Sequence, residues 1–191
     1  MTEGAVQTRR RLGRGVRGRG RARRYAQVTL ICFGLVGALR LVSIGAAADE
    51  LLPRVDAGRA AARFQAIAGY QTYAPQGLPA GWRVTSSRIT GTRAEGPVAW
   101  HLGHLTARGE YAAVEQSDEN PATFIPRMTN RDRPVGTQQV AGATWERYYR
   151  SDKKQYSLAR RFPGVTIVVT GTAPYPDLAT LAAALRQRSR P

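Results

Sequence analysis

The two histidines of the chain are the first side chains to consider for chemistry, because imidazole is the commonest metal ligand and general base in proteins. His101 and His104 stand three residues apart in the segment "HLGH". On a strand, side chains three residues apart point to opposite faces of the sheet. The one cysteine, Cys32, lies far from both in the sequence. We therefore expect no metal site and no cofactor.

Carboxylates form the second set of candidates, in the segment "EYAAVEQSD". Glu110, Glu115 and Asp118 could supply the acid and the base of a glycoside hydrolase, which needs two carboxyl groups about 5–10 Å apart. On a strand, Glu110 and Glu115 would point to opposite faces, and Ser117 lacks the G-x-S-x-G setting of a serine nucleophile. We therefore predict that the protein is not an enzyme. A hydrolase of the cell envelope that uses these three carboxylates is the alternative.

Basic side chains beyond residue 120 are the third set. A cluster of guanidinium groups binds phosphates and carboxylates, so these residues could bind an anionic polymer of the envelope, lipid headgroups or another envelope protein. A solvated surface whose charges are screened by salt is the alternative reading. The glycines of the chain form no phosphate-binding fingerprint. The candidate anion- or partner-binding residues are Arg127, Arg131, Arg133, Arg147, Arg150, Lys153 and Lys154.

A strongly basic tail, residues 1–24, begins the chain. The 191 residues include 29 Lys and Arg against 13 Asp and Glu, which gives a formal net charge of +16. The tail mixes arginine with glycine, a composition typical of disorder. It resembles an RNA-binding arm but contains no aromatic side chain for stacking on bases. Its arginines are Arg9, Arg10, Arg11, Arg14, Arg17, Arg19, Arg21, Arg23 and Arg24.

An apolar segment, residues 25–48, follows the tail and contains a single charged residue, Arg40. About 20 apolar residues suffice to cross a bilayer, so we predict a transmembrane signal anchor. A signal peptide cleaved near Ala48 is the alternative. Because positive flanks stay on the cytoplasmic side, we expect residues 1–24 in the cytoplasm, flanking the lipid bilayer, and residues 49–191 outside the cell membrane.

The pattern of residues 49–191 predicts one α+β domain. Apolar side chains at helical spacing indicate a helix over residues 53–68, with Ala57, Ala60, Phe64 and Ile67 inward, and a second over residues 174–190. Between them, short alternating segments indicate an antiparallel sheet of about six strands. The unbroken apolar run "VTIVV" predicts a central strand, and the polar residues 118–139 a long loop. The expected strands are residues 82–89, 97–106, 110–117, 143–150, 155–162 and 165–171.

The order of several segments resembles a known family. "GLPAGW" is followed by "HLGHLTARGEYAAVEQS", "GATWERYYR", "VTIVVTGTA" and a final "LATLAAAL". Over roughly residues 25–188, this order is similar to the actinobacterial family called domain of unknown function 4245. The resemblance implies one N-terminal membrane span and an α+β domain outside the membrane. It implies no activity, because the family has none assigned.

The functional hypothesis from the sequence is a membrane-anchored extracytoplasmic protein that acts as a non-enzymatic binding or scaffold module of the envelope. The lack of a catalytic constellation is the observation behind it. The alternatives are the envelope hydrolase and a contact between the Arg-Gly tail and nucleic acid, although we expect no nucleic-acid partner. Phosphate contacts of such a tail would weaken steeply with salt.

Overall fold

The computed structural model of the chain describes residues 55–188. The predicted basic tail (residues 1–24) and membrane anchor (residues 25–48) lie outside these residues. Within residues 55–188, every helix is too short or too polar to span a bilayer. The helices and strands in chain order are α2 (Ala57–Ile67), β1 (Tyr73–Pro75), β2 (Arg83–Thr90), β3 (Ala99–Leu105), β4 (Tyr111–Ser117), α3 (Pro121–Thr129), β5 (Gly136–Val140), β6 (Ala143–Arg150), β7 (Gln155–Phe162), β8 (Val165–Gly171), α4 (Tyr175–Ala183) and β9 (Leu185–Gln187).

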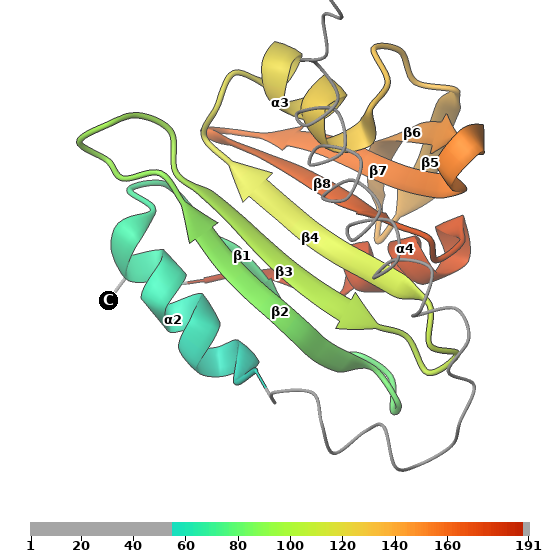
Figure 1. The fold of residues 1–191 in the computed structure, drawn as a ribbon, viewed down its shortest axis with the longest axis horizontal. Coiled ribbons are helices and arrows are strands. Elements are labelled where there is room, and N and C mark those ends of the chain that lie inside the picture. The colour runs from blue at the N-terminus through green and yellow to red at the C-terminus, as the bar shows by residue number, and fades with distance from the viewer. Residues whose placement is uncertain (1–54, 189–191) are drawn as a thin grey trace, which may run out of the picture. The chain divides into compact units, whose positions relative to one another are not determined.

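A seven-stranded antiparallel sheet organises the described residues (Figure 1). Its order is β2-β3-β4-β8-β7-β6-β5, so two meanders, β2–β4 and β5–β8, join where β4 pairs with β8. All six strands expected from the sequence are present, each within two residues of its expected ends. β8 is the middle strand and is buried at every position, which confirms the central placement of "VTIVV". The expectation of about six strands missed β5 and the separate β1–β9 pair.

One face of the sheet carries the larger core and is covered by α2 and α4. Phe64 of α2 stacks on Trp100 of β3 with ring centroids 4.8 Å apart. Leu178 and Leu181 of α4 are fully buried in a cluster that includes Ile167 of β8. On the opposite face, α3 packs against β6, β7 and β8 through apolar side chains. The β2–β4 part of that second face carries a set of polar side chains, described below.

One helical expectation is confirmed and one needs correction. Phe64 of the predicted inward face of α2 is fully buried, Ala60 and Ile67 pack against the same cluster, and Ala61 joins them. The C-terminal helix ends at Ala183 rather than near residue 190. Its last turn is followed by β9, which pairs with β1.

The predicted long loop, residues 118–139, contains helix α3 and most of strand β5. The side chain of Asn120 caps α3 by accepting a hydrogen bond from the Ala122 N–H at 2.9 Å. Pro121 occupies the first helical position, where the missing N–H costs nothing. Proline therefore marks the start of a helix here, and reading this stretch as a loop was wrong.

Candidate functional site

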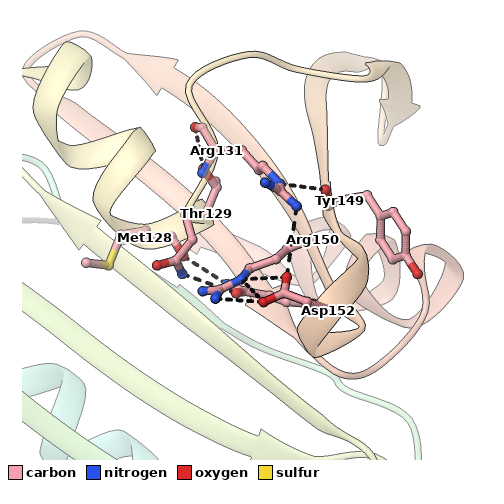
Figure 2. Close-up of polar contacts among 8 residues, drawn as sticks. Met128, Thr129, Arg131, Tyr149, Arg150 and Asp152 are labelled. Carbon is pink, nitrogen blue, oxygen red and sulfur yellow. Dashed lines mark hydrogen bonds and ion pairs between the residues drawn. The ribbon is translucent and has the colours of Figure 1, made fainter.

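Five of the predicted basic residues lie on two adjacent segments, the loop after α3 and the tip of the β6–β7 hairpin. Figure 2 shows the side chains of Arg131 and Arg150 converging from these two segments. The two segments are separated by almost 20 residues in the sequence, so their proximity could not be predicted from it. We call this set the basic corner; its members are Arg131, Arg133, Arg150, Lys153 and Lys154.

Asp152 of the hairpin tip lies between Arg131 and Arg150. Arg150 donates to both carboxylate oxygens of Asp152. Its Nε lies 2.9 Å from Oδ1, and its Nη2 lies 2.9 Å from Oδ2. Nη2 of Arg131 lies 4.0 Å from Asp152 Oδ1, and its Nε donates to the Tyr149 carbonyl at 3.1 Å. The hydrogen bonds from Arg150 hold the pKa of Asp152 below its usual value. The carboxylate therefore stays ionised at neutral pH and offsets part of the positive charge.

Gln155 fixes the end of α3 against the hairpin, and Thr129 makes a hydrogen bond within α3 itself. The hydroxyl of Thr129, a buried residue, donates to the Ile125 carbonyl at 2.9 Å. Gln155 of β7 donates from Nε2 to the Met128 carbonyl at 3.0 Å and to the Thr170 hydroxyl at 2.9 Å. The loop that carries Arg131 and Arg133 thus starts from an anchored point.

The other two predicted basic residues are engaged elsewhere. Arg127 of α3 forms an ion pair with Glu119, and its guanidinium lies 5.4 Å from the centre of the Phe124 ring. The guanidinium of Arg147 lies 3.9 Å from the centre of the Tyr175 ring. Such cation–π contacts hold a charged side chain against an aromatic surface. Neither residue adds a free charge to the basic corner.

A second group of polar side chains lies on the β2–β4 part of the sheet. The imidazole of His101 is at its centre. Nδ1 of His101 lies 2.5 Å from Oε1 of Glu115, and Nε2 lies 3.1 Å from the hydroxyls of Ser86 and Tyr111. We call these four residues, which come from three adjacent strands, the polar cluster.

The contacts of the polar cluster determine the protonation of its histidine. A carboxylate only accepts hydrogen bonds, so the nitrogen of His101 that faces Glu115 carries the proton. In the neutral ring the single lone pair of Nε2 then faces the hydroxyls of Ser86 and Tyr111. Burial raises the pKa of Tyr111, so its hydroxyl keeps the proton that it donates. The sequence of contacts from Ser86 through His101 to Glu115 is that of a nucleophile, a base and an orienting carboxylate.

Gly103 makes room for the polar cluster. A Cβ atom at this position would overlap the Ser86 hydroxyl and lie 2.7 Å from the Tyr111 hydroxyl. Both hydroxyls therefore occupy the space of an absent side chain. The side chains of His101 and Glu115 are 18% and 17% exposed, so the cluster is largely buried but reaches the solvent.

The polar cluster was only partly foreseeable. The sequence offered His101 as a candidate metal ligand and Glu115 as a candidate member of a carboxylate pair, but it did not join the two. The signal that joins them is their directly opposite position in the β3–β4 register. Ser86 was missed because a bulge between Val84 and Ser86 shifts the β2–β3 register by one residue.

The three carboxylates proposed for a hydrolase do not form a pair. Glu110 precedes β4 and Asp118 follows it, which separates them by roughly 25 Å along the strand direction. Glu115 is bound to His101, and Asp118 accepts a hydrogen bond from the Val98 N–H at 2.8 Å. Glu110, Glu115 and Asp118 therefore do not form the carboxylate pair that the alternative hydrolase hypothesis requires.

His101 and His104 point to opposite faces, as the sequence predicted. Within residues 55–188, His, Cys, Asp and Glu side chains form no group of three suited to a metal ion. His104 is fully buried near Trp82, with ring centroids 6.4 Å apart. Its two ring nitrogens make no hydrogen bond, and burial lowers its pKa to about 4. His104 is therefore a neutral core residue at physiological pH.

Comparison with known proteins identifies one family and two similar structures. The model of the family described as "Protein of unknown function (DUF4245)" matches residues 25–185. No curated protein matches the chain. A crystal structure of MucB in complex with MucA(peri) is similar over 62% of this chain and 37% of that chain, with 16% identity and a TM-score of 0.39. The Pseudomonas aeruginosa MucA/MucB complex gives 15% identity and a TM-score of 0.38, over 62% of this chain and 35% of that chain.

Proposed function

Because the chain belongs to the family described as protein of unknown function (DUF4245), we propose a function from its own residues: a membrane-anchored, extracytoplasmic binding module of the cell envelope. The basic tail and the apolar segment of residues 25–48 support the anchor. The excess of arginine before this segment supports a cytoplasmic N-terminus. The domain that follows would then meet envelope polymers and proteins outside the membrane.

The basic corner is the observation that carries the proposal. Five cationic residues lie on two segments that also carry two carboxylates, Asp132 and Asp152. Most of them are exposed, and α3 and the β6–β7 hairpin fix where they lie. A phosphate-rich or carboxylate-rich envelope polymer offers several anions at once, so weak contacts with each cation add up. Binding should weaken as salt screens the charges.

The test uses the full chain in nanodiscs of zwitterionic lipid and cell walls isolated from the source organism. Arg133→Gln with Lys154→Asn removes two exposed charges, and asparagine tolerates the left-handed backbone of residue 154. We expect the double variant to be retained several-fold less on the walls, and retention to fall with added salt. Equal retention of wild type and variant at low salt would reject the basic corner as the binding surface.

The geometry of the polar cluster favours a second candidate function, hydrolysis of an ester. Oγ of Ser86 would attack the acyl carbon while its proton passes to Nε2 of His101, and Glu115 would stabilise the charged imidazole. The alcohol would leave with that proton, and water would then release the acid from Ser86 by the reverse route. This reaction differs from the two-carboxylate hydrolase considered from the sequence, because it uses only Glu115, as the partner of His101.

Covalent labelling distinguishes this candidate from a purely structural cluster. A fluorophosphonate probe should label the full chain at Ser86, and Glu115→Gln should slow the labelling. Ser87→Ala is the matched control, because Ser87 lies on the other face and accepts a hydrogen bond from Trp100 Nε1 at 2.9 Å. If Ser86 stays unlabelled while a known serine hydrolase reacts in the same tube, the hydrolase candidate fails.

A further inference from the structure

Strand β2 forms one edge of the seven-stranded sheet. In the described residues it pairs only with β3, so its outer side presents backbone N–H and C=O groups without strand partners. The bulge at Val84/Ser86 interrupts the first half of the strand, while residues 86–90 keep a regular register with β3. The second half of β2 is therefore a straight strip of about five residues to which another strand could pair.

A groove runs between this strip and helix α2. Figure 1 shows α2 running alongside β2 at this border of the sheet. The groove has a volume of about 550 Å³ and opens to solvent. Its walls are Arg59, Ala60 and Arg63 of α2 and residues 87–89 of β2, with Asp56 at the start of the helix.

The charges of the groove favour an acidic occupant. Arg59 is 88% exposed on its side chain, and its nearest carboxylate, Asp56, lies 3.9 Å away. That carboxylate is already used as the helix cap, accepting from the Arg59 N–H at 3.0 Å. Arg63 and Arg88 form no ion pair with another described residue. Ala60 and Ile89 add apolar surface between the arginines.

We propose that β2 and the groove bind an extended acidic segment of a partner protein, which pairs with residues 86–90 as an additional strand. Backbone hydrogen bonds to the free edge supply affinity, and alternate side chains enter the groove. The side chains that enter the groove are acidic: their carboxylates contact Arg59 and Arg63, and their CH2 groups pack on Ala60 and Ile89. This inference rests on the proposed binding function and names a partner class and a second surface.

The probe is a fluorescein-labelled seven-residue peptide of alternating valine and glutamate, titrated into the full chain in zwitterionic nanodiscs. Anisotropy should show saturable binding. A lysine–valine peptide should bind at least tenfold more weakly, because its charges repel the arginines. A glutamate–valine peptide with N-methyl groups along one edge should also lose at least tenfold, because it cannot form the strand hydrogen bonds.

Variants locate the binding surface. Arg59→Glu with Arg63→Glu should weaken binding of the glutamate–valine peptide at least tenfold, and circular dichroism checks that α2 remains folded. Arg133→Glu, a charge reversal in the basic corner, should leave this binding unchanged. Amide hydrogen exchange of residues 86–90 should slow when the peptide is bound.

Each contrary result has a defined meaning. Equal binding of the N-methylated peptide would overturn strand addition, and unchanged binding by the α2 variant would overturn the location. No binding of the glutamate–valine peptide would overturn the inference as a whole. If wall retention through Arg133 and Lys154 is intact in that case, only this inference fails and the proposed binding function stands.

Discussion

Gln116 and Tyr73 form a reciprocal pair that joins the small sheet to the large one. Oε1 of Gln116 accepts from the Tyr73 N–H at 3.0 Å, and its Nε2 donates to the Tyr73 carbonyl at 2.6 Å. Gln116 is fully buried in β4, and Tyr73 begins β1, which pairs with β9. One amide therefore satisfies both backbone groups of a residue outside the main sheet.

The Gln116→Leu variant should be strongly destabilised. It leaves a backbone donor and a backbone acceptor of Tyr73 unsatisfied, at a cost of about 2–4 kcal/mol in the free energy of unfolding. Urea denaturation measures the loss. Gln139→Leu is the control, because Gln139 is exposed and its hydrogen bond to Thr144 is at the surface. Similar losses in the two variants would show that the Gln116–Tyr73 pair contributes little.

Stability should depend on pH through His104. The pKa is about 4 in the folded chain against 6.5 when unperturbed, so the unfolded state binds more protons between these values. The contribution of His104 to the free energy of unfolding is therefore fully present above pH 6.5. It is lost as the pH is lowered towards 4, by up to about 3 kcal/mol. Unfolding at pH 7 and pH 4.5 should show this loss in the wild type and a smaller loss in His104→Leu. An equal loss in both would assign the pH dependence to other groups.

Gly103→Ala should disturb the polar cluster. The new Cβ meets the hydroxyls of Ser86 and Tyr111, and overpacking of this kind costs about 1–3 kcal/mol. The imidazole signals of His101 should shift in NMR spectra. In a double-mutant cycle, Ser86→Ala should recover part of the loss by removing one of the two clashing groups. Strictly additive effects would mean that Gly103 and Ser86 do not interact.

Asp152→Asn tests the charge balance of the basic corner. Removal of the carboxylate frees Arg150 from a two-pronged pair and raises the net positive charge of the corner. Retention on cell walls at low salt should increase, while the thermal midpoint changes little because Asp152 is exposed and surface ion pairs contribute little to stability. Weaker retention of the variant would show that the positions of Arg131 and Arg150, and not their net charge, control binding.

The sequence by itself determined the class of the fold and most of its strands, because alternation, turn residues and helical spacing are local properties. β6, β7 and β8 begin and end at the expected residues. The Asn120–Pro121 pair was also a local signal, for the start of α3. The prolines of residues 118–139 led instead to the assignment of a loop. The β1–β9 pair gave no usable pattern, because each strand has only three residues.

The tertiary structure alone decided which side chains meet. Without the bulge in β2, Ser87 and not Arg88 would lie opposite His101, and Thr85 would replace Ser86 at the position opposite Gly103. A one-residue shift of register exchanges the two faces of a strand, so the polar cluster depends on an irregularity that no local pattern announces. The basic corner likewise depends on α3 and the β6–β7 hairpin packing together. Residue types and spacing fix what each segment becomes, whereas register and packing fix which distant groups come within hydrogen-bonding distance.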